Sequence, residues 1–256
     1  MKILVLIKEV PDTAATRMLN SETGILDRVA SEPVPDEINE RTLEHALRYR
    51  DGGAEAEIVV LAVVPDTAVT SVRKFLAMGA DSAVIVSDPN IAGADAARTS
   101  QIIAAAVERI APDLVLAGNE STDGRGGVVP SMVAEYLGWP VLPSLNELEI
   151  TEGTVAGSVT VEAETLRLSA SLPAVASVTE RSAEARFPNF KGIMQAKKKP
   201  LETWTLADVA VGEERAANSV MVSAALRPAR TAGTKVEDDG TAVAALVDFM
   251  ASNRLI

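Results

Sequence analysis

The chain contains no cysteine and only one histidine, His45, among its 256 residues. The lack of cysteine excludes disulfides, thiolate nucleophiles and thiolate-bound metals. A single histidine also makes a histidine-based metal site or a Ser-His-Asp triad a poor hypothesis. We therefore expect no metal site, and we interpret His45 as a surface or interface residue of a helix.

Positive charge and long apolar runs are also scarce. The formal net charge of −12 argues against nucleic acid or an anionic membrane as the main partner. The apolar run within residues 1–8 is too short for a signal peptide or a membrane span. We expect a soluble, cytoplasmic protein with no nucleic-acid partner and no stable membrane insertion.

Buried-strand runs alternate with helical periodicity over the first 140 residues. This alternation predicts an α/β fold with a doubly wound, mostly parallel sheet. Asp36 is the expected N-cap of the first helix. Strands are expected at residues 3–10, 58–64, 82–86 and 113–117, and helices at 36–50, 67–78, 94–110 and 128–137.

The pattern changes after Trp139-Pro140. Short strands at residues 145–150, 154–162, 165–171 and 174–179, separated by turn residues, predict antiparallel hairpins added to the edge of the sheet. We expect an α/β nucleotide-binding domain at residues 1–200. An extended C-terminal arm at 201–256, with a helix near 241–253, is expected to pack on another chain.

A glycine-rich loop at residues 118–127 follows the fourth predicted strand and begins a helix. Open α/β sheets bind ligands at the carboxyl ends of their strands, and a helix N-terminus offers backbone N–H groups to a phosphate. Arg125 adds a charged donor, and Ser121 and Thr122 add hydroxyls. The loop lacks a Walker A pattern. It predicts phosphate or nucleotide binding, with a tight turn that needs glycine for geometry alone as the alternative.

Other polar and aromatic features allow two readings each. The carboxylate pairs Asp36-Glu37 and Glu213-Glu214 fit capping and solvated surface better than acid–base catalysis. The run of lysines at residues 197–199 fits either a docking surface or cations at the end of a preceding helical turn. Phe187 and Phe190 are either exposed docking residues or part of the core.

Several stretches of the sequence, in the same order and over nearly the whole chain, resemble the electron-transfer flavoprotein beta-subunit family. The most specific stretch is 187–199, which begins Phe187-Pro188-Asn189-Phe190 and ends with the three lysines. The other matching stretches are residues 5–12, 36–40, 77–81, 113–118, 134–140, 164–167, 172–175, 230–233 and 253–256.

The resemblance implies a heterodimer whose alpha subunit holds FAD, while this chain holds a structural AMP and has no turnover of its own. Acyl-CoA-type dehydrogenases would deliver electrons, and a quinone reductase or similar acceptor would receive them. Family AMP contacts correspond to Leu6, Asp36, Val63, Gly118, Asn119, Glu120, Ser121, Thr122, Asp123, Gly124, Arg125, Gly126, Gly127, Val128 and Val129.

The resemblance also implies a partner-recognition loop near residues 184–199. Its anchor corresponds to Phe190, and Lys191, Ile193 and Met194 accompany it. An aromatic residue that some members place near the flavin corresponds to Thr13.

Two other functions stay open. Electron-bifurcating relatives hold a second FAD where other members hold AMP. A stand-alone adenine-nucleotide enzyme would need a pyrophosphate-gripping loop after the first strand, where Lys8-Glu9-Val10-Pro11-Asp12 has neither glycine nor serine.

Overall fold

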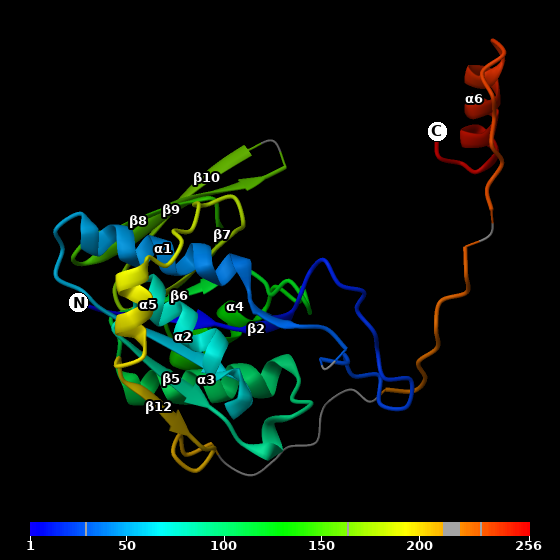
Figure 1. Cartoon of the computed structure of the whole chain (residues 1–256). Coiled ribbons are helices and arrows are strands. Elements are labelled where there is room, and N and C mark those ends of the chain that lie inside the picture. Colours follow the sequence, from blue (N-terminus) through cyan, green and yellow to red (C-terminus); the bar gives the residue numbers. More distant parts are fainter. Residues whose placement is uncertain (29, 163, 212–220, 231) are drawn as a thin grey trace.

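A seven-stranded parallel sheet forms the centre of the computed structural model, which describes residues 1–28, 30–162, 164–211, 221–230 and 232–256. The strand order is β12-β5-β4-β1-β6-β11-β7, and every neighbouring pair is parallel. The strands are β1 (Lys2–Ile7), β4 (Glu57–Val63), β5 (Ser82–Val86), β6 (Leu114–Gly118), β7 (Val141–Leu145), β11 (Ala174–Val178) and β12 (Leu201–Trp204). Figure 1 shows this sheet between layers of helices.

Strand β1 lies near the middle of the sheet and is buried on both faces. Val5 is in register with Val60 of β4 and Leu116 of β6. Ile3 and Val5 join one core cluster, whereas Leu4 joins the cluster on the opposite face. A strand covered on both faces has no polar alternation, which explains the continuous apolar run in the sequence.

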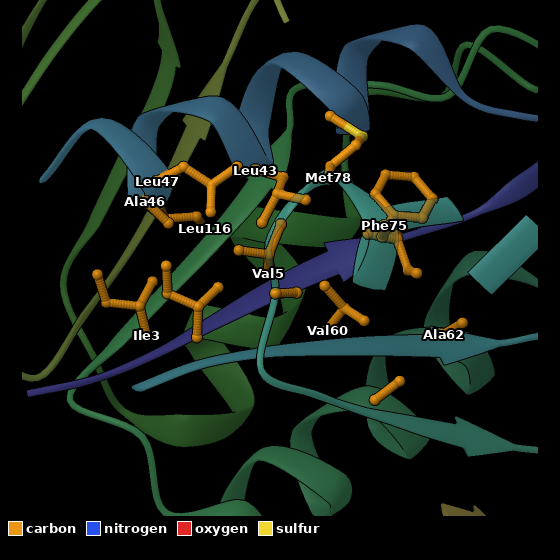
Figure 2. Packing of buried hydrophobic residues seen from close by; sticks show 14 of the residues in the cluster. Ile3, Val5, Leu43, Ala46, Leu47, Val60, Ala62, Phe75, Met78 and Leu116 are labelled. Carbon is orange, nitrogen blue, oxygen red and sulfur yellow. The ribbon is translucent and has the colours of Figure 1, made fainter. Parts of the chain in front are cut away.

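Helices cover both faces, which confirms the predicted doubly wound α/β fold. One face packs against α1 (Glu37–Asp51) and α2 (Val69–Met78), and the other against α3 (Ala96–Ile110) and α4 (Val129–Leu137). Figure 2 shows Leu43, Ala46 and Leu47 of α1 above β1, beside Phe75 and Met78 of α2. Short 3-10 helices, η1 (Asp66–Ala68) and η2 (Pro89–Ile91), follow β4 and β5.

The antiparallel part differs in detail from the expectation. β8 (Glu147–Ile150), β9 (Thr154–Val161) and β10 (Glu164–Ser171) form a separate three-stranded antiparallel sheet. The last expected hairpin strand, β11, instead runs parallel between β6 and β7, and β7 itself was not expected as a strand. All five residues of β11 are buried, as is typical of a central parallel strand.

The first expected strand is also divided in two. β1 ends at Ile7, and β2 (Glu9–Pro11) pairs antiparallel with β3 (Pro33–Pro35). This small ribbon leaves Lys8 at the carboxyl end of β1.

The other edge of the sheet takes in residues beyond position 200. β12 pairs parallel with β5, and the guanidinium of Arg109 lies 4.1 Å from the ring centroid of Trp204. Before β12, α5 (Phe190–Ala196) packs against α2. Further along the chain, α6 (Ala242–Ser252) stands apart from the main body (Figure 1). Residues 212–220 of the arm, with Glu213-Glu214, and Thr231 lie outside the described residues.

Within the described residues, no helix has both the length and the apolar character needed to cross a membrane. The same part of the chain contains no group of three or more His, Cys, Asp or Glu residues placed to hold a metal ion.

Candidate functional site

The sheet topology places a crevice between the carboxyl ends of β1 and β6. From β1 the chain builds the sheet through β4 and β5 in one direction, and then returns to add β6 on the other side of β1. Such a reversal of strand order is where open α/β sheets bind ligands. Lys8 follows β1 and the glycine-rich loop follows β6, so both lie at this crevice.

Asp36 holds the glycine-rich loop to the start of α1. Its Oδ1 accepts from the backbone N–H of Ile38 at 2.9 Å, which caps α1. Its Oδ2 accepts from the backbone N–H of Thr122 at 2.7 Å and from the Thr122 hydroxyl at 3.1 Å. The carboxylate is fully buried. One side chain therefore fixes both the helix end and the loop.

Asp123 carries a buried negative charge inside the loop. Its Oδ1 accepts from Lys8 Nζ at 2.7 Å, and its Oδ2 accepts from Arg28 Nη2 at 2.8 Å. Burial would raise the pKa of Asp123, but the hydrogen bond and charge of Lys8 and the hydrogen bonds of Ser121 and Arg28 hold that pKa well below its ordinary value. The carboxyl is therefore ionised at neutral pH, and the two cations compensate it.

The loop ends at a helix N-terminus that can receive an anion. The N-cap residue of α4 is Val128, whose side chain has no hydrogen-bonding group. Gly127 has a φ of 65°, in the region that favours glycine, and brings the chain into the helix. The dipole of the helix and the N–H groups of its first turn, to which Pro130 contributes none, favour a phosphate.

Two buried amide oxygens lie at the same crevice without a hydrogen-bond donor among the described residues. They are Asn39 Oδ1 in α1 and Asn119 Oδ1 directly after β6. A side chain at Gly118 would put its Cβ 2.8 Å from Asn39 Nδ2, so glycine allows α1 to approach β6 closely. An unpaired buried acceptor costs about 1–3 kcal/mol, which a ligand donor would recover.

An open hollow of about 530 Å³ extends from the loop toward the segment after β2. This volume lies within the range of roughly 300–1,000 Å³ for small-molecule sites. The hollow is lined by Thr13, Ala15, Arg17, Glu37, Thr122 and Arg125. Of the family contact positions, Thr122 and Arg125 line this hollow and the others do not. Leu6 and Val63 pack in or against the core cluster beside α3 and α4.

The expected docking segment, residues 184–199, presents two aromatic rings to solvent. Phe187 is 94% exposed and Phe190 is 81% exposed, so neither folds back into the core. Lys191 is exposed, and Ile193 and Met194 are about half exposed. The structure thus displays these five side chains on another surface, formed by α5 and the residues just before it.

One expectation for a charged residue is wrong, and another is confirmed in part. His45 is buried in α1, with 8% of its surface exposed, because the sheet and residues 183–186 cover that part of the helix. In the lysine run, Lys199 Nζ donates to the carbonyls of Leu76 and Ala80. Lys199 therefore caps the end of α2, whereas Lys197 and Lys198 directly follow α5, the helical turn expected before the lysine run.

Comparison with known proteins decides the family. A model of the electron transfer flavoprotein domain matches residues 23–209. The chain is 43% identical over 263 residues to the electron transfer flavoprotein subunit beta of Mycobacterium tuberculosis, with 99% of each chain covered. The chain belongs to the electron transfer flavoprotein beta-subunit family. The family's role is electron transfer.

Two other relatives in this family are informative. The electron transfer flavoprotein subunit beta of Mycobacterium leprae is 43% identical over 264 residues, again with 99% of each chain covered. The caffeyl-CoA reductase-Etf complex subunit CarD of Acetobacterium woodii is 32% identical over 217 residues, which cover 84% of this chain and 82% of that protein.

Lys8, Arg28 and Asn39 were missed in the sequence as parts of the site. Lys8 had a readable signal, because it is the first charged side chain after the most apolar strand and so lies at a strand end. Arg28 and Asn39 had none, since they reach the crevice only through the β2–β3 ribbon and the packing of α1 against β6.

Proposed function

We propose that this chain is one half of a heterodimeric electron-transfer flavoprotein of the cytoplasm, without turnover of its own. An alpha subunit holds the FAD, which shuttles electrons from acyl-CoA-type dehydrogenases to a quinone reductase or similar acceptor. The chain's contribution is architectural: it binds a structural AMP, supports the flavin-bearing subunit and docks the dehydrogenase. Full-length similarity to relatives named as beta subunits supports this assignment.

The proposal that the chain binds AMP is based on the crevice between β1 and β6. It combines two buried amide oxygens in need of donors with a glycine-rich loop and the N-terminus of α4. The exocyclic amine of adenine is a hydrogen-bond donor, and a phosphate suits backbone N–H groups at a helix N-terminus. Donor, acceptor and charge requirements of AMP therefore match what the crevice offers.

Each charged residue of the crevice then has a defined task. Asp36 holds the loop closed through Thr122, and Lys8 and Arg28 compensate the buried charge of Asp123. Without these cations, Asp123 would repel a bound phosphate. The binding free energy of AMP adds to the stability of the folded chain, because the crevice exists only in the folded state.

A second FAD in place of AMP is the alternative that one observation favours. The hollow lined by Thr13, Arg17 and Arg125 adjoins the loop and offers space beyond a mononucleotide. The adenylate half of FAD would use the same crevice. AMP remains our proposal, since the amide oxygens and the loop already account for an adenylate.

The deciding experiment identifies the small molecules released from the complex purified with its flavin-bearing partner. After denaturation, chromatography with mass detection should give one AMP and one FAD per heterodimer. Two FAD molecules would establish the alternative. ATP hydrolysis or adenylation by the chain alone would instead identify a stand-alone enzyme and overturn the proposal.

Gly126→Val tests the position of the phosphate. A Cβ at Gly126 meets no atom of the chain within 4 Å, so the valine should block a ligand without disturbing the protein. We expect the AMP content to fall well below one per heterodimer. Gly153→Val is the matched control, because Gly153 has equally open surroundings but lies in the β8–β9 turn. Full AMP content in the Gly126 variant would place the phosphate elsewhere.

A further inference from the structure

The docking segment is attached to α1 just before its exposed aromatic residues. Arg41 Nη1 donates to the carbonyl of Ala183, and Arg48 Nη2 donates to the carbonyl of Glu184 at 3.2 Å. Two arginines of α1 thus bind the carbonyls of two consecutive residues at the start of the docking segment.

The strongest attachment is an ion pair between Glu44 of α1 and Arg186. Arg186 Nε donates to Glu44 Oε2 at 2.7 Å and Nη2 donates to Oε1 at 3.1 Å, so the guanidinium binds both oxygens. The same guanidinium reaches Asp51 Oδ2 at 2.8 Å, and Arg48 Nε binds Glu44 Oε1 at 2.9 Å. Planar two-point pairing fixes direction as well as distance.

Burial makes this ion pair specific to one arrangement. The side chain of Glu44 is only 6% exposed. Burial would raise the pKa of Glu44, but hydrogen bonds from Arg186 and Arg48 lower it below its ordinary value. The carboxylate therefore stays charged and is compensated by Arg186 and Arg48, since a buried unpaired charge is strongly unfavourable.

The other end of the docking segment is attached to α2. A Cβ at Gly192 would lie 2.3 Å from the carbonyl oxygen of Ala77, so α5 and α2 are in close contact. Arg73 Nη1 donates to the carbonyl of Ala196 at 2.6 Å. The exposed rings therefore stand on a short stretch that is held on both sides.

Phe187 is the residue next to Arg186, and Phe190 begins α5 three residues later. The fold gains little from either ring, because both are almost fully exposed. The attachment at Arg186 fixes the chain at the point where these rings leave the surface. Holding a binding residue in place before contact reduces the entropy lost on association.

We infer that Glu44 and Arg186 are positioning residues for partner docking: their ion pair pre-orders Phe187 and Phe190 in the orientation that the dehydrogenase meets. This inference rests on the docking role proposed for Phe190. Its consequence is that loss of Arg186 weakens productive encounter, while electron transfer within the docked complex is unchanged.

The test uses the heterodimer with its FAD as the substrate of an acyl-CoA dehydrogenase supplied with acyl-CoA. For Arg186→Gln we expect the dehydrogenase's KM for the carrier to rise about 3- to 10-fold, with kcat unchanged. Arg186→Lys keeps the charge but cannot bind both oxygens of Glu44, so its KM should be intermediate. Arg186 is partly exposed and Arg48 still pairs with Glu44, so the variants should fold.

A double-mutant cycle with Phe190→Ala separates positioning from general stability. Phe190→Ala alone should raise KM about tenfold. If Arg186 acts by placing the ring, Arg186→Gln should add little further effect in the Phe190→Ala background. Arg181→Gln is the matched control: Arg181 lies just before the docking segment, is well exposed and pairs only loosely with Glu180, at 3.6 Å.

The outcomes distinguish the inference from the function on which it rests. If Phe190→Ala raises KM but Arg186→Gln does not, the positioning role is wrong and the docking role stands. A full Arg186 effect in the Phe190→Ala background, or an equal effect of Arg181→Gln, also overturns positioning, since charge alone would then explain it. If Phe190→Ala leaves KM unchanged, the docking surface itself is wrong, and the inference falls with it.

Discussion

A single buried side chain can make the stability of a fold depend on pH, and His45 is such a residue. Its Nε2 is buried and has no hydrogen-bond partner among the described residues. Burial and the nearby charge of Arg48 lower its pKa from 6.5 to about 4, against a smaller opposing effect of Glu44. The folded protein thus holds this imidazole neutral where an unfolded chain would protonate it.

Stability should therefore fall as the pH drops from about 6.5 toward 4, because the unfolded state binds the proton first. Between pH 7.5 and pH 5 the pKa shift corresponds to about 2 kcal/mol of unfolding free energy. We expect His45→Gln to reduce the acid-dependent loss by that amount, measured by urea unfolding at both pH values. The chain has no other histidine, so an unchanged pH dependence would show that His45 does not cause it.

At the scale of elements, the lysine run shows how neighbours in sequence can have different tasks. Lys199 Nζ donates to the carbonyls of Leu76 at 3.0 Å and Ala80 at 2.5 Å, beside the C-terminus of α2. Burial lowers its pKa, and so does Arg50, whereas Asp81 raises it. Lys197 and Lys198 are exposed. The third lysine therefore stabilises the end of α2.

Lys199→Gln should destabilise the protein by about 1–2 kcal/mol, because two hydrogen bonds from a charged donor at a helix C-terminus are lost. Lys198→Gln removes the same charge from an exposed position and should change stability by about 0.5 kcal/mol or less. The free energy of urea unfolding measures both. Equal effects in the two variants would contradict capping of α2 by Lys199.

Local patterns predicted the elements whose cause is local. Strands β1, β4, β5 and β6, the helices after them and the Asp36 cap follow from apolar runs and capping residues, although the first expected strand is divided into β1 and β2. β11 was misassigned because Ala174–Val178 is a short apolar run that fits several strand environments, and only its pairing with β6 reveals a central parallel strand. The loop after β6 was predicted as the binding site from topology, whereas Arg28 reaches it across 95 residues of sequence.

At the scale of the whole molecule, the helix of the C-terminal arm, α6, has no surface to pack against among the described residues. α6 buries none of its residues, and Val243, Leu246 and Phe249 are 74%, 57% and 59% exposed. It also stands apart from the sheet (Figure 1). An apolar helix of this kind suits a groove on a partner. We propose that it packs on the alpha subunit.

Replacing Leu246 and Phe249 together with glutamate should weaken the heterodimer at least about tenfold, because two apolar side chains would lose a buried environment. Titration calorimetry of the purified subunits measures the Kd. Ser252→Glu with Asn253→Glu adds the same charge to the same end of the chain and serves as the control. Since the two apolar side chains are exposed, the melting temperature of the separate chain should not change. An unaltered Kd would mean that the alpha subunit is held by the α/β domain, and that α6 has another partner.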